Sequence, residues 1–210
     1  MADNYLEKRY DDFKNARNNA KKKTVSFDTL LAKNRSYRGY DKSFVVQRSM
    51  LERIVGVNTK IPSARNQQVL RFRIVTKGEQ ADCILGNIKL GASLPDLKLP
   101  VKGCEPEAFI VICSTVPESK YVHIDLGISI QSMLLKATEM GLNGICICAF
   151  NAEIICHTLS LPYTPLAILA IGKGAEKIET TLISEKESHA YYRENGIHYV
   201  PKVRTEDLII

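Results

Sequence analysis

Three short apolar runs separated by turns constrain this chain most strongly, because each has the length of one buried strand. They are Phe109–Cys113, Ile145–Phe150 and Leu166–Ile171. Runs of this length favour strands inside a sheet, whereas a membrane-spanning helix needs about 20 apolar residues. A further strand is predicted over Val69–Thr76, where Leu70, Phe72 and Ile74 alternate with other residues, so that one face is largely buried. We therefore expect a sheet-based core and no membrane association.

Helical patterns lie between these runs. The strongest predicts a helix over Asp125–Met140, with Asp125 as its N-cap and Gly141 as its C-terminal stop. Because this helix has few polar positions, we expect it to be deeply buried, in the core or at a subunit interface. Shorter helices are predicted over Val45–Val55 and Ala152–Leu159, and residues 79–90 fit neither pattern clearly.

The two ends of the chain differ in character from its centre. Residues 1–23 are polar with one loose apolar face, which predicts a helical arm ahead of a domain over residues 24–210. Near the other end, Tyr199–Arg204 and then Leu208–Ile210 predict a closing strand or an arm laid on a partner. The start of the sequence lacks the apolar segment of a signal peptide, so we expect a cytoplasmic protein with reduced cysteines.

The net charge of +6 has three possible sources: a solvated surface, a nucleic-acid partner or a bound phosphate. The densest basic run, Lys21–Lys23, has no aromatic residues interleaved with it and no reader motif around it. We therefore expect no nucleic-acid partner.

Few residues fit familiar catalytic or metal-binding signatures. Cys146 and Cys148 share a strand face and precede Cys156 and His157, but no second Cys pair completes a zinc pattern. We therefore read the cysteines as buried small hydrophobes and expect no metal. The chain also lacks a serine-nucleophile motif, a phosphate loop and a dinucleotide fingerprint. The remaining histidines, which are His123, His189 and His198, are predicted to lie on the surface or to cap helices.

Cationic clusters in turns at both ends of the chain are the unusual feature. They are Arg35-Ser36-x-Arg38, Ser63-Ala64-Arg65-Asn66-x-Gln68 and Lys202-x-Arg204. A phosphate monoester is well bound by guanidinium forks and a hydroxyl, and side-chain amides suit the edge of a heterocycle. From composition alone, surface arginines around turns remain the competing interpretation.

The ordered set of these motifs resembles the nitroreductase family of FMN enzymes over residues from about 30 to 210. Besides the clusters, the matching elements are Asp125-Leu126-Gly127-x-x-x-Gln131, Gly141-Leu142-Asn143-Gly144, the Ile171-Gly172 strand ending and Pro201 before Lys202. The resemblance implies an α+β fold with a central, mostly antiparallel sheet wrapped by helices. It also implies an intertwined homodimer in which the final strand crosses to the partner.

The resemblance further implies FMN at the subunit interface. Arg35, Ser36 and Arg38 would hold the phosphate and the polar edge of the flavin, and Lys202 and Arg204 would also meet the phosphate. The flavin and ribityl chain would be lined, in part from the other subunit, by Ser63, Arg65, Asn66 and Gln68. Cys148 and Ala149 fall where the family presents backbone to the central ring of the flavin.

The activity implied is hydride transfer from NADH or NADPH to a small acceptor, such as a nitroaromatic or a quinone, by a ping-pong cycle. The flavin carries this chemistry, so no catalytic side chain is assigned. Val69-Leu70 stands where the family often has Pro-Trp, and Lys173 stands where it often has Pro, which bears on substrate specificity. A non-catalytic flavin carrier or sensor using the same pocket is the alternative.

Overall fold

The structure is a computed structural model that describes Arg9, residues 25–91 and residues 99–210. The predicted arm over residues 1–23 lies outside these residues apart from Arg9, so the division into arm and domain stays a prediction. Among the described helices, none is both long enough and apolar enough to cross a membrane.

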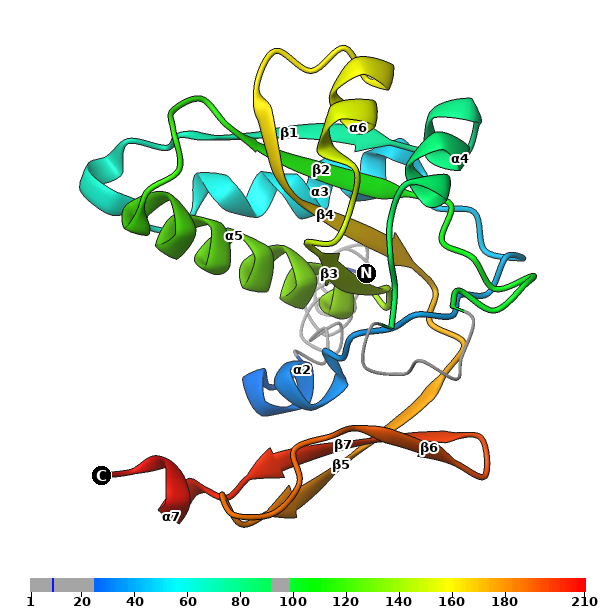
Figure 1. Cartoon of the computed structure of the whole chain (residues 1–210), viewed down its shortest axis with the longest axis vertical. Helices are drawn as coiled ribbons and strands as arrows, with labels where there is room; N and C mark the ends of the chain where they lie inside the picture. The colour runs from blue at the N-terminus through cyan, green and yellow to red at the C-terminus, as the bar shows by residue number, and fades with distance from the viewer. Residues whose placement is uncertain (1–8, 10–24, 92–98) are drawn as a thin grey trace, which may run out of the picture.

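A four-stranded antiparallel sheet forms the centre of the body (Figure 1). In spatial order its strands are β1 (Leu70–Val75), β2 (Phe109–Ser114), β4 (Thr164–Gly172) and β3 (Asn143–Ile147). A strand is therefore confirmed in each of the four predicted regions, but β3 begins at Asn143 and ends at Ile147, whereas the prediction ran from Ile145 to Phe150. β1 also shows the expected alternation, because Leu70, Phe72 and Ile74 are half-buried while the arginines between them are exposed.

Helices cover both faces of this sheet (Figure 1). They are α3 (Arg48–Val55) and α5 (Lys120–Glu139) on one face, and α4 (Glu79–Gly86) and α6 (Ala152–Thr158) on the other. Successive side chains of a strand point to opposite faces, so β2 contributes to two cores. Phe109 and Val111 pack with α4 and α6, whereas Ile110 and Ile112 pack with α3 and α5.

The boundaries of the long helix α5 correct one prediction. Ser119, not Asp125, is its N-cap, and the Ser119 hydroxyl accepts a hydrogen bond from the Val122 N–H at 3.4 Å. The apolar face does extend into the first turn, since Val122 is buried four residues before Leu126, so the prediction began the helix too late by taking Asp125 as its cap. The predicted stop is confirmed: Gly141 has a φ of +76°, and the Leu142 N–H bonds the Ala137 carbonyl at 2.9 Å.

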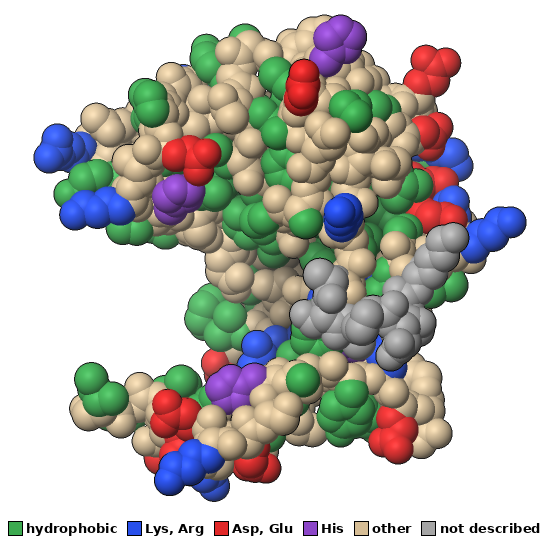
Figure 2. Space-filling model, in the orientation of Figure 1, with side chains coloured by type: hydrophobic (Ala, Val, Ile, Leu, Met, Phe, Trp, Pro, Cys, Tyr) green, Lys and Arg blue, Asp and Glu red, His purple; other side chains and the backbone are tan. Residues whose placement is uncertain are grey.

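A second, smaller sheet stands apart from the body at the C-terminal end (Figure 1). Its spatial order is β5 (Lys177–Ile183), β7 (Ile197–Val203) and β6 (Tyr192–Glu194), with β5 and β7 parallel, and α7 (Thr205–Leu208) follows. The predicted strand near Tyr199–Arg204 is confirmed as β7, which pairs within its own chain. α2 (Phe27–Lys33) lies between the body and this sheet, and Figure 2 shows the molecule hollowed there.

The chain leaves β4 for the second sheet through two glycines that have no room for a side chain. A Cβ on Gly172 would lie 2.5 Å from the Tyr40 ring, and one on Gly174 would lie 2.4 Å from the Tyr37 ring. Tyr40 is buried, and its hydroxyl donates to the Tyr37 carbonyl at 2.9 Å. The segment after α2 is therefore packed directly against the exit of β4, which fixes where the second sheet departs.

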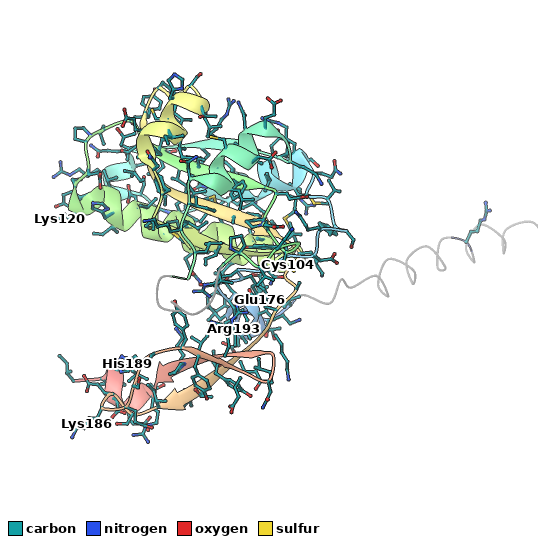
Figure 3. The ribbon with its side chains drawn as sticks, turned by 45° about the vertical axis from the view of Figure 1, so that its right-hand side comes forward. Cys104, Lys120, Glu176, Lys186, His189 and Arg193 are labelled. Atoms are coloured by element: carbon teal, nitrogen blue, oxygen red, sulfur yellow. The ribbon has the colours of Figure 1, made fainter. Side chains whose placement is uncertain are left out.

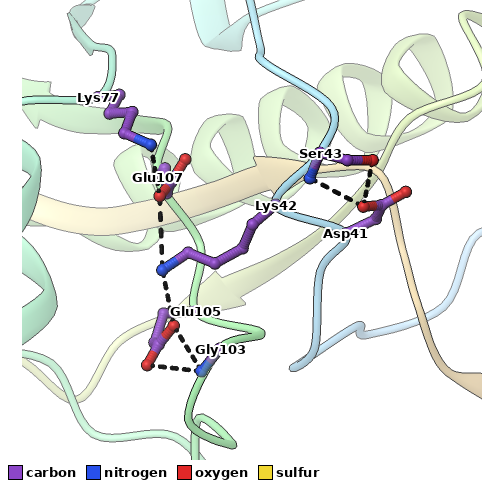
Figure 4. A network of polar contacts seen from close by, with 7 residues as sticks. All are labelled: Asp41, Lys42, Ser43, Lys77, Gly103, Glu105 and Glu107. Carbon is purple, nitrogen blue, oxygen red and sulfur yellow. Dashed lines mark hydrogen bonds and ion pairs between the residues drawn. The ribbon is translucent and has the colours of Figure 1, made fainter.

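An ion-pair network ties the loop before β2 to the segment after Tyr40 (Figure 4). The Lys42 ammonium lies 2.8 Å from a Glu105 oxygen and 3.4 Å from Glu107, and Lys77 lies 3.1 Å from Glu107. The Gly103 N–H also donates to the Glu105 carboxylate at 3.0 Å. The hydrogen bond from Lys42, followed by those from the backbone N–H groups of Glu105 itself and of Gly103, lowers the pKa of Glu105 to about 2.

We expect Glu105→Gln to lower the free energy of unfolding at pH 6 by no more than about 1 kcal/mol, because surface ion pairs are weak. The folded-state pKa of Glu105 is depressed, so its stabilisation is present above its ordinary pKa and is lost as pH falls towards about 2. Urea titrations at pH 6 and pH 3 measure this. The difference between wild type and variant should shrink at pH 3, and an unchanged difference would contradict the assignment.

Candidate functional site

A cavity of about 310 Å³ lies where the second sheet meets the body. This volume is within the range of small-ligand pockets, roughly 300–1,000 Å³. Its walls come from the segment after α2, from α5 and from the second sheet. The lining residues are Asn34, Arg35, Ser36, Arg38, Gln131, Leu134, Ile178, Tyr191, His198, Val200 and Lys202.

Strand geometry explains the wall on the side of the second sheet. His198, Val200 and Lys202 alternate along β7, so their side chains share one face, and all three line the cavity. Ile178 lies opposite His198 in the β5–β7 register and extends the same wall. The fold thus brings Lys202 to Arg35, Ser36 and Arg38, which are more than 160 residues away in sequence.

The opposite wall is held to the edge strand of the main sheet. Ser36 forms an isolated bridge with Gly144 at the start of β3, and the Tyr37 N–H donates to the Gly144 carbonyl at 3.2 Å. A Cβ on Gly144 would lie 2.8 Å from both the Ala170 carbonyl and the Leu134 side chain, so only glycine fits there. This contact places the Arg35–Arg38 segment along the outer edge of β3.

Arg38 is the most deeply buried cation of the cavity, with 8% of its surface exposed. Its Nη1 donates to the Ser36 carbonyl at 3.1 Å and lies 3.5 Å from Nε2 of His198. Its guanidinium carbon lies 5.1 Å from the centre of the Tyr191 ring. The Arg38 Nε is buried and has no hydrogen-bond partner among the described residues, so this guanidinium retains a donor for a ligand.

Glu176 joins the two halves of the site (Figure 3). Its carboxylate accepts hydrogen bonds from the backbone N–H groups of Arg38 and Gly39, the latter at 2.9 Å, and pairs with the Arg193 guanidinium. Only 11% of the Glu176 side chain is exposed. One carboxylate therefore links the segment after α2 to strand β6.

The electrostatics of the cavity favour an anion. Arg35, Arg38 and Lys202 line it, and no Asp or Glu is among its described lining residues. Within residues 25–91 and 99–210, Lys202 forms no ion pair. Burial, and then the charges of Arg38 and Arg193, lower the pKa of His198, which keeps this imidazole neutral near pH 7.

Two predicted cations are engaged elsewhere. Arg35 lines the cavity, but its guanidinium also donates to the carbonyls of Leu31 at 2.8 Å and Ala32 at 3.1 Å at the end of α2. Arg204 does not line the cavity, because β7 ends at Val203 and Arg204 becomes the N-cap of α7. Its guanidinium lies 3.3 Å from Asp207 and 3.4 Å from Glu206.

Cys148 and Ala149 are exposed just beyond the end of β3. Gly144, which contacts Ser36 and Tyr37, lies four residues earlier, and an extended strand rises about 3.3 Å per residue. The predicted phosphate-binding segment and the predicted ring-binding backbone therefore lie about 13 Å apart along one strand.

The predicted cluster Ser63-Ala64-Arg65-Asn66-x-Gln68 lies apart from this cavity. Ser63 and Gln68 instead line a separate pocket of about 480 Å³, together with Asp125. Arg65, Asn66 and Gln68 are exposed and have φ angles of +52°, +54° and +51°, which L-residues adopt at a cost of roughly 1–3 kcal/mol each. The buried Asp125 carboxylate accepts from the Ala64 N–H at 2.8 Å and holds this strained loop on α5.

Some lining residues were missed or misjudged from sequence. His198 was predicted to be superficial, which is wrong: only 3% of it is exposed. His123 and His189 are exposed, as predicted. Gln131 and Tyr191 also line the cavity. The alternation of His198 with Lys202 along β7 was the available signal.

The described residues contain no group of three or more His, Cys, Asp or Glu side chains able to hold a metal ion. Cys146 and Cys148 do share one side of the chain, with their sulfurs 3.9 Å apart.

Comparisons with known proteins agree with this architecture. Residues 104–173 match the model of the nitroreductase family. A nitroreductase family protein from Clostridium difficile 630 is 25% identical with a TM-score of 0.58, covering 72% of this chain and 86% of its own. The fold is that of the nitroreductase family. The expected α+β class with its mostly antiparallel central sheet is thereby confirmed.

Two further solved structures of nitroreductases have a similar fold. A protein from Exiguobacterium sibiricum 255-15, solved in complex with FMN, has a TM-score of 0.61 at 18% identity, covering 72% of this chain and 90% of its own. A variant of an FMN- and NADPH-dependent nitroreductase from Sphigopyxis sp. strain HMH has a TM-score of 0.58 at 18% identity, covering 72% and 89%. Among curated proteins, none matches the sequence.

Proposed function

We propose that this protein is an FMN-dependent oxidoreductase. The observation that carries the proposal is the cavity in which Arg35, Arg38 and Lys202 converge with Ser36, with no carboxylate among the described residues that line it. A phosphate monoester carries about −1.5 to −2 charge at neutral pH and is bound best by such donors. The solved FMN complex of a similar fold supports the choice of ligand.

The residues present fit FMN on two counts. The buried Nε of Arg38 has no protein partner among the described residues, which a phosphate oxygen would satisfy. Ser36 on the cavity wall bridges Gly144 at the start of β3, and the exposed residues Cys148 and Ala149 lie about 13 Å further along the chain, where the ring system would be placed.

Bound FMN would supply two-electron hydride chemistry, and the chain would bind and orient the reactants. Arg35, Arg38 and Lys202 would hold the phosphate, while the backbone at Cys148 and Ala149 would fix the ring. We assign no catalytic side chain. We further propose NADH or NADPH as the donor and a small nitroaromatic or quinone as the acceptor, in a ping-pong cycle. The FMN- and NADPH-dependent nitroreductase of similar fold supports the donor.

We also propose that the functional unit is an intertwined homodimer. The strained loop with Ser63, Arg65, Asn66 and Gln68 lies outside the cavity of its own chain, so it would reach the site of a second subunit. The mostly apolar helix α5 leaves Ile124, Gly127 and Gln131 exposed along one face, which would pack against the partner.

The visible spectrum of the purified protein, followed by release and identification of its chromophore, tests the ligand. We expect a yellow protein, or an apoprotein that takes up FMN at micromolar concentration. NAD(P)H oxidation with a quinone or nitroaromatic then tests the activity. A colourless protein that binds no FMN would refute the flavin site. A bound flavin that no nicotinamide reduces would refute the enzyme and favour a carrier.

A further inference from the structure

Cys146 and Cys148 form a pair of neighbouring thiols at the end of β3. Their Sγ atoms are 3.9 Å apart. Cys146 lies within β3 and is paired in register with Leu169, whereas Cys148 follows the last residue of the strand, Ile147. Only one of the two cysteines is therefore held by the sheet ladder.

The two thiols differ in their access to solvent. Cys148 is exposed and Cys146 is half-buried. Burial, followed by the neighbouring Cys148, raises the pKa of Cys146 to about 12. Because the thiolate is the attacking species in thiol exchange, Cys146 is a poor first nucleophile and Cys148 is the accessible one.

We propose that Cys146 and Cys148 are a redox-active dithiol that closes to an intramolecular disulfide by exchange with a low-molecular-weight disulfide. This goes beyond the proposed flavin chemistry and needs no flavin, although it uses Cys148, whose backbone would also contact the flavin ring. The 3.9 Å contact must shorten to the bond length of about 2.05 Å. Cys148 lies between the end of β3 at Ile147 and the Ala149 carbonyl, which accepts from the Lys89 N–H at 2.8 Å, so the adjustment falls on Cys148 and the two side chains.

The exchange proceeds in two balanced steps. The Cys148 thiolate attacks one sulfur of the small disulfide, forming a mixed disulfide and releasing one small thiol. The Cys146 thiolate, after losing its proton to solvent, then attacks the Cys148 sulfur and releases the second small thiol. The protein loses two electrons and two protons, and the small disulfide gains them.

The test is exposure of the full-length protein to glutathione disulfide at pH 8, followed by N-ethylmaleimide under denaturing conditions and intact-mass analysis. We expect two of the six cysteines to lose reactivity. Fragmentation should then locate the bond between residues 146 and 148, and reductant should restore both thiols. Loss of no thiol, or a bond to Cys156 or to a second chain, would overturn the proposal.

Single variants separate the two roles. In Cys146→Ala, the reaction should stop at a stable glutathione adduct on Cys148. In Cys148→Ala, the remaining Cys146 should form its adduct at least about 10-fold more slowly. Cys104→Ser is the matched control and should still lose two thiols. If Cys148→Ala still loses two thiols, or if Cys146→Ala forms no adduct, the proposed pair is wrong. Circular dichroism of each variant confirms that it is folded before the comparison.

Discussion

Replacing Lys202 by alanine is expected to weaken FMN binding by about 10- to 150-fold. This corresponds to the loss of one charge-assisted hydrogen bond to the phosphate, about 1.5–3 kcal/mol. Lys202 is the cation most available for this contact, because it lines the cavity and forms no ion pair within the described residues. Arg35, in contrast, also bonds the end of α2.

Titration of apoprotein with FMN, followed by flavin fluorescence, measures this affinity. Lys186→Ala is the matched control, because it removes the same charge from an exposed turn of the second sheet away from the cavity (Figure 3). The FMN affinity of Lys186→Ala should stay within about 2-fold of that of the wild type, since a surface charge away from the site is largely screened. Equal affinities for wild type and Lys202→Ala would place the phosphate elsewhere.

Replacing Glu176 by glutamine is expected to lower the free energy of unfolding by about 2–3 kcal/mol, because it leaves the Arg193 guanidinium without its largely buried anion and weakens the acceptor of two backbone N–H groups. Glu176 accepts from the Arg38 and Gly39 N–H groups and pairs with Arg193 at the junction of the body and second sheet. Since Arg38 and Lys202 approach the cavity from opposite sides of this junction, FMN affinity should fall as well.

Urea unfolding of the apoprotein measures the stability change. Glu179→Gln is the control on the strand that follows, β5, because Glu179 pairs with Lys177 at the surface, 2.9 Å away. The Glu179→Gln variant should lower the free energy of unfolding by less than about 1 kcal/mol. If the two variants unfold at the same urea concentration, Glu176 does not hold the halves of the site together.

The main sheet and most of its covering helices were readable from local patterns. β2 is buried on both faces, so its apolar run is continuous, and β1 has one half-buried face, so its pattern alternates. The C-terminal end of α5 was equally clear, since Gly141 adopts a positive φ. Its first turn was missed because Asp125 was taken as the cap, although Val122 continues the apolar face back towards Ser119.

The site was predictable only in part. The three cationic clusters were visible as motifs, and two of them do meet in one cavity. Arg204 does not line the cavity, because strand β7 ends one residue earlier, at Val203, and the Lys202-x-Arg204 spacing does not reveal this boundary. His198 lies against Arg38 from the segment after α2, against Tyr191, and opposite Arg193 on the neighbouring strand β6, none of which belongs to its own strand.

The sequence by itself determined which segments are strands and helices and where cationic side chains gather along the chain, because apolar periodicity and turn residues act over short distances. Only the tertiary structure decided which clusters share a cavity and which polar groups are buried. Those outcomes depend on contacts such as Ser36 with Gly144 and Glu176 with Arg193. Such contacts form between separate elements once packing has set their relative positions, and no local pattern specifies them.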